Sequence, residues 1–199
     1  MSEKFTLVTR YALRVTHMYL KWDEQTITDF SADKIDAMYD RGFVFTRPSE
    51  GHMEQTRSVR INLSAFELSS ENRRILRKTE GLELHTQTLP LTNYKWTIGK
   101  LAKDFYETKF GPNVFSANKV KELLTSGRKD FNRLFQYVIL NEVKDLSSDN
   151  GTDSSATPKN DVVGYCIAVE TPEIIHYSYP FYNLETAPKD TGLGMMTRA

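Results

Sequence analysis

The sequence predicts an α+β fold with a tendency toward a three-layer α/β arrangement. Between residues 31 and 127, apolar side chains recur at helical spacing in stretches that end at glycine. Between residues 131 and 182, three apolar stretches are rich in β-branched and aromatic residues and have the length of strands. We expect a small N-terminal α/β segment over residues 1–56 and a main domain over residues 57–199.

One helix followed by two strands is expected across the end of the N-terminal segment and the start of the main domain. Ser31 is a typical N-cap, and Gly42 is a typical end for the helix that follows it. The first strand is predicted at Phe43–Thr46. Alternation of Val59, Ile61 and Leu63 predicts the second at Ser58–Leu63, with a turn-rich connection over Pro48–Gln55.

Three further helices precede the strands of the main domain. The segment Ser69–Lys78 begins with serine and carries four basic residues, and Gly81 follows it. A longer helix is expected from about Asn93 to Gly111, on the helical spacing of Ile98, Leu101 and Phe105. Another is expected from Ser116 to Gly127.

The remaining chain is expected to form three strands, a glycine-containing loop and a last helix. The strands are predicted at Phe131–Asn141, Val162–Glu170 and Ile174–Tyr182, the first two joined by a flexible polar loop over residues 147–161. The last helix should begin at about Leu193 or Met195.

Composition excludes several classes of protein. No apolar run approaches the roughly 20 residues of a bilayer span, and the charged N-terminus does not resemble a signal peptide. The single cysteine, Cys166, excludes an internal disulfide and a cysteine-built metal cluster, so a cytoplasmic protein without a metal or bound cofactor is expected. The net charge of zero combines +7 over residues 41–133 with −6 over residues 142–190.

The segment Lys189-Asp-Thr-Gly192-Leu193-Gly194 is the most informative local motif. Glycines allow close approach of a ligand to the backbone, and free amides at a helix start attract phosphate. Lys189 adds a cation beside them, while an ordinary strand-to-helix turn is the alternative explanation. After two helices and three strands, this motif resembles the pyrophosphate-binding turn of coenzyme A-dependent N-acetyltransferases (the GNAT fold), with Lys189 in place of the usual Arg or Gln.

Two other segments resemble the arginyl/leucyl-tRNA–protein transferase family. MYDRGFVFTR (38–47) is similar to its RGF-type element, and RSVRINLSAFELSSENRRILRK (57–78) to its V-R-I segment and the following helix start with Phe66, Ser69, Arg73 and Arg74. The tyrosine-rich YPFYNLETAPKDTGLGMM (179–196) is similar to the strand that leads into its Leu-Gly turn. The resemblance implies an incomplete GNAT-like domain that transfers an amino acid from aminoacyl-tRNA to the N-terminus of an acceptor protein.

The sequence departs from this family at three points. The segment PSEGHMEQT (48–56) lacks the family's cysteine-containing element. Asn183 stands where an acidic residue is expected after Tyr182. The chain also ends shortly after Gly194, so we expect residues 1–199 to be catalytically silent or nearly so.

Aminoacyl transfer needs an oriented amine, a proton acceptor and stabilisation of an oxyanion, because the ester donor is already activated. The candidates are Tyr179 and Tyr182 as pocket walls and His176 as a general base, and packing is the alternative role of each. Alternation predicts that Tyr177 and Tyr179 share one face of their strand, opposite His176. Cys166 is expected to be a core residue.

The predicted donor-binding residues are Lys189, Gly192, Leu193 and Gly194, with Arg73 and Arg74 as contacts for tRNA phosphates or as part of a solvated helix face. Three functions remain open. They are an aminoacyl-tRNA-dependent aminoacyltransferase, an acetyl-CoA-dependent N-acetyltransferase that would bind coenzyme A, and a non-catalytic binding or degenerate domain.

Overall fold

The computed structural model describes residues 23–139 and 161–199, and the chain divides between Arg60 and Ile61 into two compact units. The first unit contains a three-stranded antiparallel sheet in the order β1 (Glu24–Thr26), β3 (His52–Gln55), β2 (Phe43–Phe45). Helix α2 (Ala32–Asp40) buries Ile35, Met38 and Tyr39. The predicted helix and first strand are confirmed.

The predicted strand at Ser58–Leu63 is wrong. The partner of β2 is β3, which lies in the segment expected to be a turn, and Met53 in β3 is fully buried. The β2–β3 connection ends at Gly51, whose φ of +74° and close approach to the carbonyl of Ile27 exclude a side chain. Val59, Ile61 and Leu63 alternate in sequence but are all exposed, because no strand among the described residues pairs with this segment and gives the alternation a face to bury.

The second unit is built on a four-stranded antiparallel sheet in the order β4-β5-β6-β7. Three strands match the prediction within the described residues, and Leu140 and Asn141 of the predicted Phe131–Asn141 lie outside them, as does most of the predicted loop. The elements of this unit are a 3-10 turn at Leu63–Ala65, α3 (Ser70–Lys78), β4 (Leu82–Thr88), α4 (Trp96–Phe110), α5 (Ala117–Thr125), β5 (Arg133–Ile139), β6 (Asp161–Glu170), β7 (Ile175–Tyr182) and α6 (Thr191–Arg198).

The predicted helices α3, α4 and α5 are confirmed, and their ends follow from local hydrogen bonds. The Ser69 hydroxyl caps α3 by accepting from the amide of Asn72 at 3.1 Å, and the Asn72 side-chain oxygen accepts from the amide of Ser69. Ser116 caps α5 in the same way, through the amide of Lys119. Gly111 ends α4 with a φ of +95°.

Strand β4 was not predicted. It pairs along its whole length with β5, and its polar side chains are mostly exposed, so only Leu82 and Leu84 give an apolar signal. An edge strand of this composition resembles a loop in sequence.

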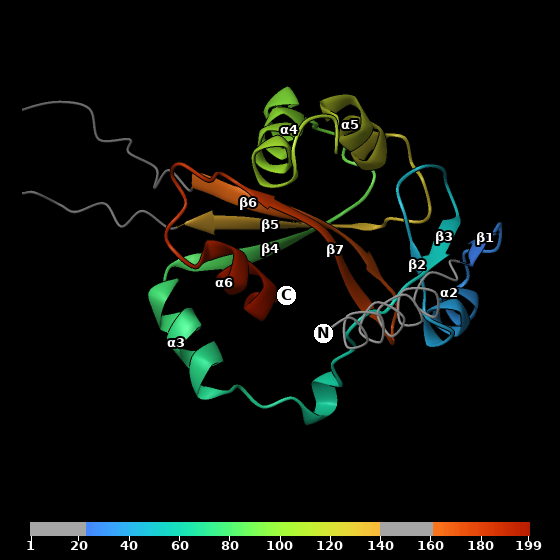
Figure 1. Ribbon diagram of the computed structural model, residues 1–199, viewed down its shortest axis with the longest axis horizontal. Coiled ribbons are helices and arrows are strands. Elements are labelled where there is room, and N and C mark those ends of the chain that lie inside the picture. The colour runs from blue at the N-terminus through green and yellow to red at the C-terminus, as the bar shows by residue number, and fades with distance from the viewer. Residues whose placement is uncertain (1–22, 140–160) are drawn as a thin grey trace, which may run out of the picture. The chain divides into compact units, whose positions relative to one another are not determined.

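Helices lie on both faces of the four-stranded sheet, with α4 and α5 on one side and α6 and α3 on the other (Figure 1). This arrangement has three layers, and the class is α+β because the sheet is antiparallel throughout. The core on the α6 face contains Leu82, Phe135, Tyr137, Val163, Cys166, Ala168 and Met195.

A buried ion pair lies between α5 and β5. The guanidinium of Arg128 donates to the carboxylate of Asp130, with Nε–Oδ1 at 2.9 Å, and both side chains are almost fully buried. Burial alone would lower the pKa of Arg128, but hydrogen bonds to Asp130 and Glu122 outweigh it and hold that pKa above its ordinary value. The arrangement leaves each buried charge with a partner.

Replacing Asp130 with alanine should lower the free energy of unfolding by about 3 kcal/mol, because the buried Arg128 charge would lose its buried partner and keep only the exposed Glu122 carboxylate. Urea unfolding followed by circular dichroism measures this loss. The matched control is Asp104→Ala, which breaks the exposed Lys100–Asp104 pair on α4 and should cost less than about 1 kcal/mol. Equal losses in both variants would contradict the assignment.

Candidate functional site

The loop between β7 and α6 is fixed by Asn183. Its side-chain oxygen accepts from the amides of Glu185 at 2.9 Å and Thr186 at 3.1 Å. The family resemblance predicts an acidic residue at position 183. An aspartate there could accept the same two hydrogen bonds, so asparagine at this position preserves the turn. The loop ends at Asp190, which adopts a left-handed conformation with φ of 69°.

Helix α6 begins at Thr191, two residues before the earlier of the two predicted starts. Gly194 therefore lies inside the helix, and its amide donates to the carbonyl of Asp190 at 2.9 Å. The amide of Thr191 donates to the carbonyl of Pro188, and the Asp190 side chain does not cap the helix. Within the described residues, this leaves the amides of Gly192 and Leu193 as donors without an acceptor, so they can bind an anion and Gly194 cannot.

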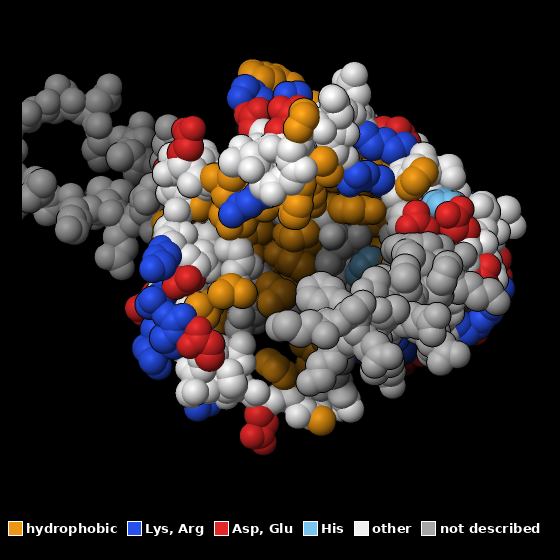
Figure 2. All heavy atoms as spheres, in the orientation of Figure 1, with side chains coloured by type: hydrophobic (Ala, Val, Ile, Leu, Met, Phe, Trp, Pro, Cys, Tyr) orange, Lys and Arg blue, Asp and Glu red, His pale blue; other side chains and the backbone are white. Residues whose placement is uncertain are grey.

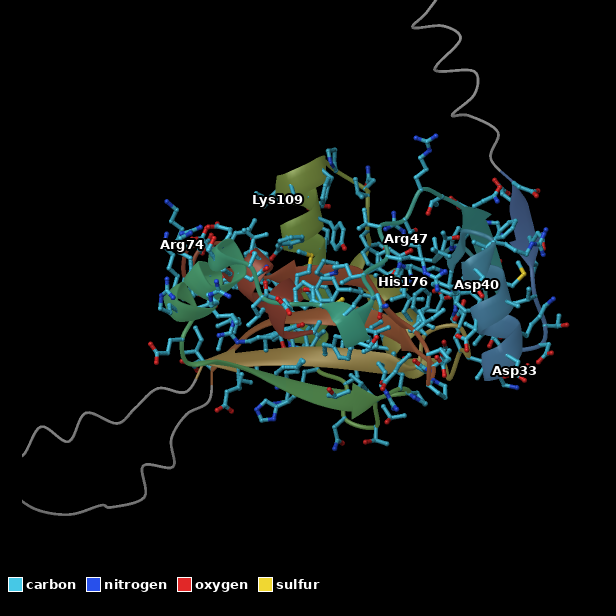
Figure 3. All side chains as sticks on the ribbon, turned by 90° about the horizontal axis from the view of Figure 1, so that it is seen from below. Asp33, Asp40, Arg47, Arg74, Lys109 and His176 are labelled. Carbon is cyan, nitrogen blue, oxygen red and sulfur yellow. The ribbon has the colours of Figure 1, made fainter. Side chains whose placement is uncertain are left out.

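Cationic side chains from α3 face this helix start. The Asp190 carboxylate lies 3.3 Å from the Lys78 ammonium and 3.8 Å from the Arg74 guanidinium. Arg74 is labelled on α3 in Figure 3. Hydrogen bonds to Glu71, with attraction to Asp190, hold the pKa of Arg74 above its ordinary value. We define the α6 corner as Arg74, Lys78, Lys189, Asp190, Gly192 and Leu193.

Two predicted donor-binding residues lie outside the α6 corner. The Arg73 guanidinium donates to the carbonyl of Leu68 instead of facing α6. Gly194 packs against Thr79, where a Cβ atom would lie 2.6 Å from the hydroxyl oxygen. The structure thus brings Arg74, Lys189, Gly192 and Leu193 to one place and separates Arg73 and Gly194 from them.

Arg198 of α6 stabilises the contact between α3 and α6 through hydrogen bonds. Its guanidinium donates to the hydroxyl and the carbonyl of Thr79, both at 2.7 Å, and to the carbonyl of Leu76. A cation at these carbonyls also complements the C-terminal end of the α3 dipole. The two helices are therefore held in a fixed relation that places Lys78 and Arg74 beside the start of α6.

The tyrosine side chains of β7 do not all point to the same face of the sheet. Ile167 pairs with Tyr179 and the next residue, Ala168, pairs with Tyr177, because a β-bulge inserts Ser178 between them. Neighbouring residues of β6 point to opposite faces, so their partners do too, and the prediction that Tyr177 and Tyr179 share a face is wrong. Tyr179 packs its ring on Phe115 and Phe131.

Tyr182 is the candidate that lies beside the α6 corner. Its ring contacts the ring of Phe105 in α4 at 4.9 Å between centroids. A Cβ atom at Gly192 would lie 3.1 Å from the same ring. Tyr182 therefore connects α4 to the start of α6, and Gly192 is small because this ring is close.

His176 lies at the other end of β7, six residues and about 20 Å of extended strand from Tyr182. It pairs with Val169 and lies on the face opposite Tyr177, as predicted. Burial lowers the pKa of His176 to about 4, so it is neutral and weakly basic at pH 7. His176 cannot act as a general base for a reaction at the α6 corner.

Cys166 is a core residue. Burial raises the pKa of its thiol, which therefore stays protonated. The hydroxyls of Tyr137 and Tyr177 lie near this thiol and near each other, yet neither has a well-oriented hydrogen-bond partner among the described residues. Burial raises the pKa of both phenols.

Figure 2 shows hydrophobic side chains gathered in a hollow between α4 and α6.

A groove of about 600 Å³ is lined by residues of α4 and of the end of β7. Its apolar lining includes Ile98, Leu101 and Phe105 from α4 and Tyr182 from the sheet. Glu185 of the β7–α6 loop and Lys100 of α4 are among its charged lining residues. Tyr182 thus borders both the groove and the α6 corner, which sequence reasoning missed because the groove joins segments 80 residues apart.

Comparisons with models of protein families, with curated proteins and with solved structures found no match. In residues 23–139 and 161–199, no three metal-ligating side chains lie close enough together to hold an ion. No helix in the same two ranges has the length and apolar character needed to cross a membrane. The site is therefore interpreted from its own geometry.

Replacing Gly194 with alanine should lower the free energy of unfolding by about 1–3 kcal/mol, because the added methyl group would force α6 away from Thr79. Thermal or urea unfolding measures this loss. The matched control is Met196→Ala on the exposed side of α6, expected to change stability by no more than about 0.5 kcal/mol. A neutral Gly194→Ala variant would show that the helices are not in close contact.

Stability should rise as the pH increases from about 4 to about 6.5. In this range the unfolded chain binds a proton at residue 176, with an ordinary pKa near 6.5, while the folded chain does not. The contribution is about 2–3 kcal/mol, present in full above pH 6.5 and lost as the pH falls toward 4. Unfolding at several pH values checks it. His176→Asn should flatten the profile, whereas His85→Asn, at an exposed position of β4, should not.

Proposed function

We propose that this chain is an acyl-transfer protein of the aminoacyl-tRNA–protein transferase type, and that the α6 corner binds a phosphate of the donor. The observation that carries the proposal is the pair of Gly192 and Leu193 amides, which have no acceptor among the described residues and lie at a helix start beside cations. A phosphate held there would accept two directional hydrogen bonds and interact favourably with the helix dipole.

The order of elements supports the same class. Two helices, an antiparallel run of three strands and a helix that follows the edge strand after the loop over residues 183–190 form the order expected for a GNAT-like domain. The resemblance of residues 57–78 to aminoacyl-tRNA–protein transferases favours aminoacyl-tRNA as the donor. Arg74 of that segment lies at the α6 corner, within ion-pair distance of Asp190.

The proposed reaction requires little covalent chemistry from the protein. The nitrogen of an acceptor amine attacks the ester carbonyl of the donor, the ester C–O bond breaks, and the released ribose hydroxyl takes up a proton as the amine loses one. Tyr182 is the nearest of the candidate residues to the corner because its ring lies against Gly192. Its role is to position the donor and acceptor beside one another.

The second candidate is an acetyl-CoA-dependent acetyltransferase. The same two amides and Lys189 suit the pyrophosphate of coenzyme A as well as a tRNA phosphate. Competition between an aminoacyl-adenosine analogue and coenzyme A separates the two donors. Displacement of a bound nucleotide by coenzyme A at low concentration favours the acetyltransferase.

The third candidate is a non-catalytic domain, favoured by Asp190. Its carboxylate already occupies the space between Lys78 and Arg74, so the cations of the corner have an internal partner. Under this interpretation the corner fixes α6 to α3, and no ligand is needed.

Adenosine monophosphate should shift the amide signals of Gly192 and Leu193 in an NMR titration of the full chain. Lys189→Glu should weaken this binding at least tenfold by reversing a charge next to the amides, and Asp190→Asn should strengthen it by removing a competing anion. Lys109→Glu, an exposed change in the last turn of α4 (Figure 3), is the matched control for Lys189→Glu.

The opposite result at Asp190 would favour the non-catalytic domain. In that case Asp190→Asn lowers stability, and the Gly192 and Leu193 signals stay unmoved in a folded sample. A transfer assay with charged tRNA and a peptide bearing a free N-terminus then tests the chemistry. Incorporation of the amino acid supports the proposal and contradicts the expectation that residues 1–199 are catalytically silent, whereas Gly192 and Leu193 signals that do not move with nucleotide contradict the proposal.

A further inference from the structure

The segment between β3 and α3 exposes a row of large apolar side chains. Val59, Ile61 and Leu63 alternate with polar residues, and their exposed fractions are 91%, 59% and 65%. Phe66 and Leu68, just before α3, are exposed as well. Alternation of this kind is typical of a strand with one apolar face, and neighbouring exposed apolar residues are typical of an interaction surface. Within the described ranges, no strand pairs with this segment.

Strand β4 has a free edge that could accept such a strand. The amide of Leu89 donates to the carbonyl of Asn132 at 3.0 Å, which sets the phase of the antiparallel ladder with β5. By alternation, the backbone N–H and C=O groups of Leu84, Thr86 and Thr88 point away from β5. Every residue of β4 after Leu84 is exposed, and among residues 23–139 and 161–199 no strand lies on this side of β4.

The other edge of the sheet is protected, whereas β4 is not. In β7 the amide of Asn183 donates to the carbonyl of Val163, so the same alternation turns Pro180 toward the free edge. Proline lacks an N–H, and the bulge at Ser178 interrupts the edge, and both features block the addition of a strand. β4 contains no proline, and its pairing with β5 is regular over all seven residues. β4 is therefore the open edge of this sheet.

We propose that residues 58–63 of one copy of this chain add as a strand to β4 of a second copy. Each copy carries both halves of the contact, so two such pairings related by a two-fold axis form a closed dimer. The alternating apolar side chains of the segment would then extend the core cluster that contains Leu82, next to the half-buried Leu84. The inference is independent of the proposed function, since it uses neither the α6 corner nor a donor.

Charge complementarity favours a second copy as the occupant. Leu84 lies on one face of β4 and Glu83 on the other. Paired strands share faces, so any register that places the apolar side chains of the segment on the Leu84 face places Arg60 on the Glu83 face. Arg60 pairs with Asp40, and Glu83 with His85, but all four side chains are about half exposed or more, so an exchange of partners costs little.

Analytical ultracentrifugation of the full chain over a range of concentrations tests the proposal. The unchanged chain should form a concentration-dependent dimer. Ile61→Glu, which places a charge in the apolar row, and Thr86→Pro, which removes an N–H from the free edge, should each weaken it about tenfold or more. Thr86→Ala keeps the N–H and is the matched control for the edge. Trp96→Glu removes an exposed apolar side chain of α4 and is the control for the segment.

Both control variants should dimerise like the unchanged chain, and circular dichroism checks that every variant is folded. Thr86→Pro is expected to fold, because the N–H of Thr86 makes no hydrogen bond to β5.

A mixture of the two weakened variants identifies the occupant of the edge. Ile61→Glu keeps an intact β4 and Thr86→Pro keeps an intact segment, so the mixture should recover one pairing and associate more strongly than either variant alone. Dimerisation that is lost in Thr86→Pro but kept in Ile61→Glu would join two β4 edges and overturn the proposal. Loss in Ile61→Glu alone, or a monomer at every concentration, would overturn it as well.

Discussion

The contact between Gly194 and Thr79 fixes the geometry on which the candidate site depends. A methyl group at residue 194 would overlap the Thr79 side chain, so α6 approaches α3 this closely only because residue 194 is glycine. Arg198 then ties α6 to the C-terminal carbonyls of α3. Through this contact the basic face of α3 is brought to the start of a helix that lies more than 110 residues later in the chain.

The glycine motif therefore combines two physical requirements. Gly194 and Gly192 are small because Thr79 and the Tyr182 ring lie close, which is a packing requirement. The free amides of Gly192 and Leu193 follow from the helix start itself, whatever side chains those residues carry. Packing explains why glycines are present, and the helix start explains what the motif can bind. A sequence pattern alone cannot separate the two, because both place glycine in the same turn.

Sequence reasoning succeeded where structure is set by local interactions. Helices α3 and α5 begin at serine caps, and α4 ends at a glycine with positive φ, so their ends are encoded within a few residues. It failed where structure depends on a distant partner. In the part of the chain that the structure describes, no strand lies beside the alternating residues Val59 and Ile61.

The candidate site could be predicted in part for the same reason. Lys189, Gly192 and Leu193 lie within one short segment of the sequence. Arg74 lies beside them because α3 packs against α6, and this contact cannot be predicted from the sequence. The bulge at Ser178 reverses the side-chain alternation of β7, and it is visible only in the register with β6. His176 and Tyr182 were considered together because they are close in sequence, yet an extended strand separates them by about 20 Å.

The charge balance of the α6 corner indicates how it would recognise an anion. Arg74, Lys78 and Lys189 are opposed by Asp190, and Arg74 is also engaged by Glu71, so little net charge remains. Charge of this size is screened over about 8 Å at physiological salt and gives little selectivity alone. Two amides in fixed directions at a helix start supply the geometry that side-chain charges lack. Under the proposed function, attraction of a polyanion would come from the excess of positive charge over residues 95–133, and its placement from the amides of Gly192 and Leu193.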